Sequence, residues 1–312
     1  MLVSLPKKWV DDNNLVKSSE VEIETGQNSL SITANKDNKP SKEVIISYPL
    51  PKEENIVADI TGAYLLGYDI IRIKGETTIP IEDREKIRES MRRLVGVEII
   101  EEEASSINIQ FLLDATSLKP EKILKRMSTI AIGMFNETLD GLVSHDKSNL
   151  QTMPNRDDEI NRQYFLLVRL IRSTMIDRRL ANIFNMENID ILDYRIAANL
   201  LEIAGDTIVE LANLISHTSV SKNDLKKIYN LVKDTENIFK KSIDAFIAND
   251  RLLAIDAIKL HRNYLKKISD LRLSLEHKNQ IPLDFLDIVY MFDRIAKSWA
   301  DIADLIKPIY KQ

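Results

Sequence analysis

The chain has 312 residues, 44% of them hydrophobic and 29% charged, which indicates two or three folded domains and argues against a mainly disordered protein. The formal net charge of −5 gives no global attraction to nucleic acid, and the absence of cysteine excludes disulfides, thiolate catalysis and cysteine-ligated zinc. Because no apolar run approaches the roughly 18 residues of a membrane span and no signal-peptide pattern is present, we expect a cytoplasmic protein.

The first 42 residues predict a small β unit and a linker. We expect strands over residues 1–5, 20–24 and 29–33, because apolar residues alternate in the two later stretches. A brief helical turn should follow Pro6, and residues 25–28 should form the hairpin turn. The stretch up to Lys42, which is rich in Lys, Asn and Asp and contains Pro40, is typical of a linker.

The sequence Ser-Leu-Pro-Lys-Lys-Trp at residues 4–9, followed by a Leu-x-Lys step and a hairpin ending in Ser-Leu-Ser-Ile-Thr, resembles the AbrB/SpoVT family of swapped-hairpin DNA-binding domains. The resemblance covers about thirty residues and is closest to domains fused to archaeal regulators. In that family another strand precedes the motif, so we expect either a truncated domain or a start codon assigned late.

The resemblance implies either DNA contact through Lys7 and Lys8 or a role in dimerisation alone. Charge does not favour DNA, because the six lysines of residues 1–42 are balanced by six acidic residues.

A second unit is expected over residues 43–117. The predicted elements are a strand at 44–48, a helix at 55–66, a strand at 67–74, a helix from Pro80 to about Leu94, and strands at 97–103 and 107–112. The order βαβαββ predicts a small α/β domain with its helices on one side of the sheet. Its acidic run, residues 101–103, is interpreted as a solvated strand end.

From residue 118 to 312 the apolar pattern is helical. Helices are predicted over residues 120–147, 155–180, 188–217, 222–248, 251–276 and 282–309. They form two repeats, about 118–217 and 222–312. An offset of 104 residues pairs Phe135 with Phe239, an offset of 100 pairs Tyr164 with Tyr264, and an offset of 91 pairs the two third helices. The sequence therefore predicts an α+β multidomain protein that ends in two all-α, three-helix bundles.

Carboxylates at helical spacing mark the third helix of the first repeat. Glu202, Asp206 and Glu210 recur every four residues and so lie on one helix face. Such a ladder is either a solvated acidic face or a source of hard oxygen ligands for Mg²⁺, Mn²⁺ or iron. Spacing alone leaves both interpretations open.

The duplication, the Asp157-x-x-Ile-Asn161 step and the Glu202-x-x-x-Asp206 motif together resemble PhoU proteins, the phosphate-uptake regulators, over about residues 118–312. The resemblance implies a six-helix fold, a homodimer, and action on the phosphate transporter ATPase or a phosphate-signalling protein. It also implies metal binding, here through Asp157, Glu202 and Asp206, with zinc added to the candidate ions.

The second repeat departs from this pattern. Glu202 is matched by Asp293, but Asp206 is matched by Lys297, and Asp157 and Asn161 are matched by Ala257 and His261. An ammonium group cannot ligate a metal, so we expect one metal site rather than two. Lys297 should instead act as a counter-ion for both Asp293 and Asp301, each four residues away.

Enzymatic motifs are missing from the sequence. It has no P-loop, GxGxxG, HExxH or GxSxG pattern, and none of the four histidines follows a glutamate by three residues as a di-iron site requires. The cluster Arg169, Arg172, Arg178 and Arg179 is either a phosphate or acidic-partner site or a solvated helix end. His261 is either a ligand or pH switch or a structural residue, and Trp9 and Trp299 are interpreted as packing residues.

The sequence therefore predicts a non-enzymatic regulator of phosphate uptake. The alternative is an AbrB-type transcription regulator whose PhoU-like part senses a ligand or metal.

Overall fold

The computed structural model describes residues 3–25, 30–34, 41–144, 146–275 and 280–306. The chain divides into two compact units, Met1–Lys42 and Glu43–Gln312. The first is a small β unit, and the second combines an α/β domain with helical bundles, which confirms the predicted fold class.

The first unit contains one short helix and one hairpin. Helix α1 spans Lys7–Asp12, and strands β1 (Val21–Thr25) and β2 (Leu30–Ala34) pair antiparallel. The strand predicted at residues 1–5 is wrong over residues 3–5, which have no strand partner in the described part of the unit. Residues 26–28 of the predicted turn lie outside the described residues.

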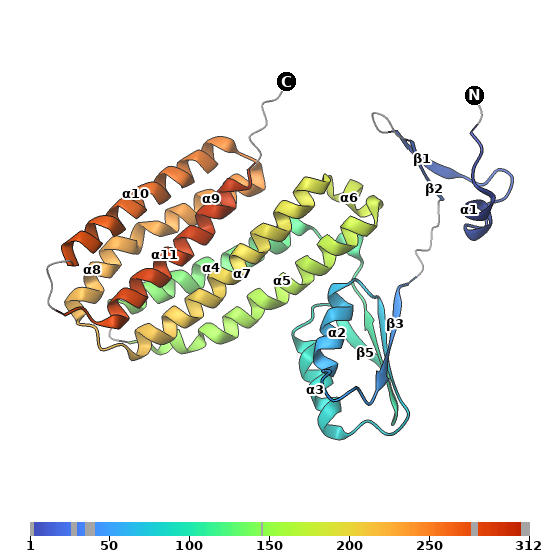
Figure 1. Cartoon of the computed structure of the whole chain (residues 1–312), viewed down its shortest axis with the longest axis horizontal. Coiled ribbons are helices and arrows are strands. Elements are labelled where there is room, and N and C mark those ends of the chain that lie inside the picture. Colours follow the sequence, from blue (N-terminus) through green and yellow to red (C-terminus); the bar gives the residue numbers. More distant parts are fainter. Residues whose placement is uncertain (1–2, 26–29, 35–40, 145, 276–279, 307–312) are drawn as a thin grey trace. The chain divides into compact units, whose positions relative to one another are not determined.

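The α/β domain has the predicted βαβαββ order (Figure 1). Strands β3 and β4 are parallel, the other pairs are antiparallel, and the sheet order is β3-β4-β6-β5. Both helices cover the same face of the sheet (Figure 1). The elements are β3 (Glu43–Tyr48), α2 (Ile56–Leu65), β4 (Ile70–Gly75), α3 (Ile81–Arg92), β5 (Val97–Glu102) and β6 (Ser106–Phe111).

Alternation in the strands places the core of this domain under its helices. Ile71 and Ile73 of β4 and Ile107 and Ile109 of β6 are buried, whereas the residues between them face the other side of the sheet. Helix α2 begins where the Asn55 side chain accepts a hydrogen bond from the Val57 amide. The domain thus has its own hydrophobic core.

The rest of the second unit is helical. Its α-helices are α4 (Pro120–Gly141), α5 (Met153–Ile176), α6 (Arg178–Phe184), α7 (Asn188–His217), α8 (Lys222–Val232), α9 (Glu236–Ala248), α10 (Arg251–Leu275) and α11 (Leu283–Asp304). Two predicted helices are interrupted. Segment 155–180 breaks at Asp177, which caps α6, and segment 222–248 breaks at a 3₁₀ turn over residues 233–235.

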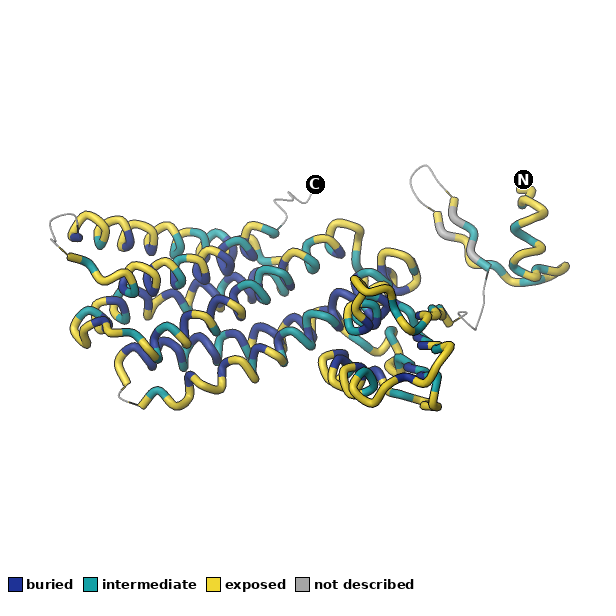
Figure 2. The backbone as a smooth tube through the Cα atoms, turned by 60° about the horizontal axis from the view of Figure 1, so that its bottom comes forward, coloured by how far each residue is buried: buried dark blue, intermediate teal, exposed yellow. Residues whose placement is uncertain are grey.

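The two three-helix repeats share a single hydrophobic core. Helices α4, α5 and α7 pack together, as do α9, α10 and α11, and α7 lies along α11 (Figure 1). Figure 2 shows buried residues along the inner sides of these helices. The fully buried Trp299 ring lies 4.7 Å from each of Phe135 and Phe239, the pair related by the duplication, so its packing role is confirmed.

Within the described ranges, the structure has no helix both long and apolar enough to cross a membrane.

Candidate functional site

Asp157 lies in the interior between α5 and α7. The residue is 9% exposed, its Oδ2 atom accepts a hydrogen bond of 3.0 Å from the Asn161 amide, and its Oδ1 atom has no hydrogen-bond partner. Across the helix interface stands Gly205, whose missing side chain leaves room for this carboxyl group. A buried oxygen without a donor is uncommon in proteins, which makes this position a candidate site.

The electrostatics show that the three predicted carboxyl groups are neighbours. Burial, together with the negative charges of Asp206 and Glu202, raises the pKa of Asp157 to about 7, and the hydrogen bond from Asn161 opposes the rise. Burial also raises the pKa of Glu202, with a further contribution from Asp206 and an opposing one from Arg195. The fold therefore brings Asp157, Glu202 and Asp206 into one region, as their helix registers suggest.

The arrangement does not by itself form a metal centre. Among the described residues there is no group of three His, Asp or Glu side chains placed to hold a metal ion. Metal binding through Asp157, Glu202 and Asp206 stays a prediction.

Next to these carboxyl groups the first repeat supplies its own cation. The Arg195 guanidinium lies over the ring of Tyr164, at 5.1 Å from its centroid, and its charge acts on Glu202. The Tyr164 hydroxyl and Arg195 both donate to Asn199 Oδ1, at 3.3 and 3.5 Å. Arg195, Tyr164 and Asn199 are therefore paired with one another.

The matching region of the second repeat is different. Ala257 is fully buried where Asp157 stands in the first repeat. Three buried polar atoms there have no hydrogen-bond partner among the described residues: His261 Nε2, Tyr264 Oη and Asp293 Oδ1. Burial lowers the pKa of His261, while Asp293 opposes the shift.

The expectation that Lys297 would serve both neighbouring aspartates is wrong for Asp293. Its ammonium donates to Asp301 at 3.1 and 3.2 Å, and no ion pair with Asp293 occurs among the described residues. Lys297 is exposed on α11, and reaching the buried Oδ1 atom of Asp293 would require its ammonium to leave water.

Arg169 has a role that the sequence did not reveal. Rather than joining a solvated cluster, its guanidinium is buried, donates to the Tyr64 and Tyr68 carbonyls at 2.8 Å each, and pairs with Asp69. It also lies 3.8 Å from the centroid of the Phe111 ring. Arg169 thus joins helix α5 to the α/β domain. No local pattern signals this, because all its partners are about 60 to 105 residues away.

The candidate DNA-binding residues are exposed. Lys7 and Lys8 open helix α1, and Asp11 and Asp12 close it, so the helix carries both signs of charge. DNA contact by these lysines stays a prediction.

Known proteins of one family are similar to this chain. The structure is similar to the crystal structure of PhoU from Pseudomonas aeruginosa (16% identity, TM-score 0.42, covering 60% of this chain and 93% of that one). It is also similar to the phosphate transport system regulatory protein PhoU from Streptococcus pneumoniae (18% identity, TM-score 0.47, covering 60% and 91%). No curated protein sequence matches the chain. The family model described as the PhoU domain matches residues 124–215, so the first helical repeat is the part of this chain with a recognisable family likeness.

Proposed function

We propose that the protein is a non-enzymatic, cytoplasmic regulator of phosphate uptake that acts by contact with a phosphate transporter ATPase or a phosphate-signalling protein. The observation that carries the proposal is the PhoU domain match over residues 124–215, within a duplicated helical fold. The buried carboxyl group of Asp157 supports a sensing role for the first repeat, because its protonation and any cation nearby change the charge between α5 and α7.

The proposal is tested by co-purification. Tagged full-length protein is recovered from phosphate-starved and phosphate-replete cells, and its bound proteins are identified. Enrichment of a phosphate transporter ATPase or a phosphate-signalling protein, with a yield that depends on phosphate, supports the proposal. If neither class is recovered under either condition, the proposal is wrong.

A parallel measurement addresses the first unit. Retention on DNA that falls steeply with added salt would indicate phosphate-backbone contacts and favour a regulator of genes. The charge-reversal variant Lys7→Glu/Lys8→Glu should abolish such retention if these two lysines carry it.

A further inference from the structure

Helices α10 and α11 enclose a small cavity whose wall carries one unpaired carboxylate. Its volume is about 180 Å³, comparable to one leucine-sized molecule, and most of its lining is apolar. Asp293 is part of that lining: its Oδ1 atom is buried and has no hydrogen-bond partner among the described residues, so an ammonium in the cavity would meet the carboxylate at its other oxygen. The lining consists of Leu271, Arg272, Leu275, Phe285, Leu286, Val289, Tyr290 and Asp293.

Comparison with the first repeat shows which polar partners Asp293 lacks. With the offset of 91, Leu286 takes the place of Arg195 and Tyr290 takes the place of Asn199. In the first repeat, Arg195 lies over the Tyr164 ring and counters the charge of Glu202. In the second repeat neither replacement offers a cation or an amide oxygen, so the two matching polar groups, Tyr264 and Asp293, remain without partners.

No ion pair joins Asp293 to a cation of the described residues, Arg272 of the same lining included, which leaves the carboxylate open to a donor that arrives with a ligand. The Lys297 ammonium is engaged by Asp301, as described above. Tyr264 is 4% exposed, and the charge of Asp293 acts on its hydroxyl, so the two groups are close to each other. A carboxylate beside an aromatic ring and an apolar wall is the chemistry that binds an organic ammonium, through a charge-assisted hydrogen bond and a cation–π contact.

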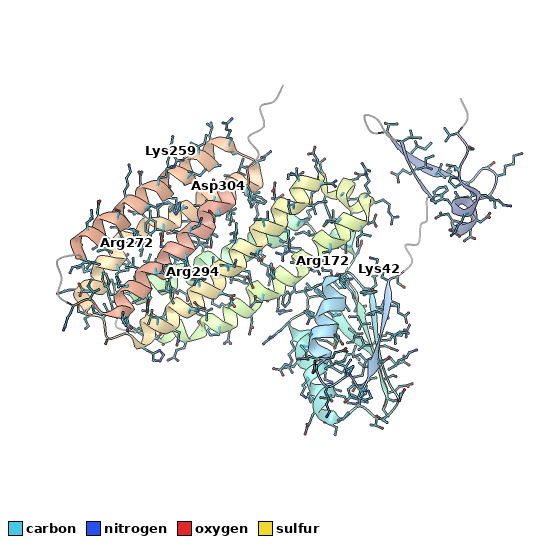
Figure 3. All side chains as sticks on the ribbon, viewed as in Figure 1. Lys42, Arg172, Lys259, Arg272, Arg294 and Asp304 are labelled. Carbon is cyan, nitrogen blue, oxygen red and sulfur yellow. The ribbon has the colours of Figure 1, made fainter. Side chains whose placement is uncertain are left out.

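We propose that this cavity binds a small primary ammonium compound with an aliphatic body, its ammonium on Asp293 where the first repeat uses Arg195. The aliphatic body packs against Leu275, Leu286 and Val289. Arg272, which comes from α10 and is labelled in Figure 3, also lines the cavity. A carboxylate on the ligand would therefore find a partner there, as in an aliphatic amino acid. This site goes beyond the proposed function and does not depend on it.

Calorimetric titration of the full chain with three probes of matched shape tests the proposal. The probes are 3-methylbutylamine, which carries only an amine, 4-methylpentanoate, which carries only a carboxylate, and leucine, which carries both. We expect one equivalent of 3-methylbutylamine to bind, with a dissociation constant of about 1 mM or below for so few atoms. If leucine binds more tightly than the amine and Arg272→Gln removes the difference, the ligand class is an amino acid. Equal affinity of leucine and the amine assigns a simple amine.

Variants link binding to the site. Asp293→Asn keeps the shape and should weaken amine binding at least about tenfold, because it removes a charge-assisted bond. Asp304→Asn, three turns along the same helix at an exposed position, makes the same charge change outside the cavity without releasing Lys297 from Asp301, and should alter binding by less than about twofold. Leu286→Trp, which fills the cavity from its partly exposed rim, should block binding without burying a charge.

Several results would overturn the proposal. They are no binding of the amine or leucine at concentrations of about 20 mM, 4-methylpentanoate binding as tightly as the amine, or an affinity unchanged by Asp293→Asn. Binding of Mn²⁺ that requires Asp293 and displaces the amine would equally contradict it.

Discussion

The carboxyl group of Asp157 faces Gly205 so closely that a Cβ atom at residue 205 would lie 2.8 Å from Asp157 Oδ1 and 3.1 Å from Ile160 Cδ1. Gly205→Ala should therefore destabilise the protein. Overpacking of a buried site costs about 1 to 3 kcal/mol, and the better helix propensity of alanine offsets about 1 kcal/mol of it. A net loss on the order of 1 kcal/mol is expected in urea unfolding.

Gly62→Ala provides the matched control for that substitution. Gly62 also lies inside a helix, but a Cβ atom there would meet nothing within 4 Å. The change should stabilise the protein by up to about 1 kcal/mol. Stabilisation by both substitutions would show that the space opposite Gly205 accommodates a methyl group.

The buried Asp157 carboxyl group should make stability depend on pH. Its pKa is raised from 3.8 to about 7 in the folded protein, so the folded state binds the proton more tightly than the unfolded state. The contribution to stability is fully present below pH 3.8 and is lost as the pH rises through about 7. Asp157→Asn removes this loss, and should be more stable than the parent protein by roughly 1 to 3 kcal/mol at pH 8 but similar at pH 4.

This prediction is checked by urea unfolding of both proteins across that pH range, in buffer containing a chelator. The parent and variant curves should diverge as the pH rises. A difference in unfolding free energy that is constant with pH would show that Asp157 does not titrate abnormally.

The position of Trp299 predicts that the two helical repeats unfold together. Trp299→Ala removes a fully buried indole that contacts an aromatic ring from each repeat, and should cost about 3 to 5 kcal/mol. Circular dichroism should still show one transition for the helices, shifted to lower urea. Trp9→Ala, in the separate first unit, should leave that transition unchanged. Two separated transitions in the parent protein would contradict the shared core.

Arg169→Met should loosen the α/β domain from helix α5. The substitution removes the hydrogen bonds that Arg169 donates to the Tyr64 and Tyr68 carbonyls and to the Asp69 carboxylate, at a cost of about 3 kcal/mol. Hydrogen exchange should accelerate at the end of α2 and in β6, while the centre of α7 stays protected. Arg172→Met, one turn along α5, is the control and should leave exchange in α2 as in the parent protein.

We predict that metal binding depends on the first repeat and not on the second. Asp206→Ala should remove binding of Mg²⁺, Mn²⁺ or Fe²⁺, whereas Asp293→Ala should leave it intact, because Lys297 and Ala257 replace two of the predicted ligands in the second repeat. Metal analysis after dialysis measures both variants. Equal loss in the two proteins, or no metal in the parent at saturating concentration, would leave the carboxylates as a purely structural group.

Much of the fold could be predicted because it follows from local periodicity. The apolar positions of the six helical segments and the alternation in the strands are visible in short windows. The duplication also pairs Phe135 with Phe239, and in the structure both rings contact Trp299. The interruptions at Asp177 and at residues 233–235 were missed, because the apolar pattern runs through both breaks.

The polar contacts could not be predicted to the same degree. Lys297 has aspartates four residues away on both sides, and only the burial of Asp293 Oδ1 decides between them. Arg169 belongs to a run of arginines that looks solvated, and its partners come from a different domain. Burial and long-range contact, which carry no local signature, decide both cases.

The hydrophobic core shared by the two helical repeats limits how independently their sequences can evolve. A substitution near Trp299 affects the packing of both bundles, so residues there cannot change in one repeat without affecting the other. Asp293 lies six residues earlier on the same helix and faces another side, away from this shared contact. The side chains between α10 and α11 can therefore diverge from those between α5 and α7 while the core shared by the two repeats is kept.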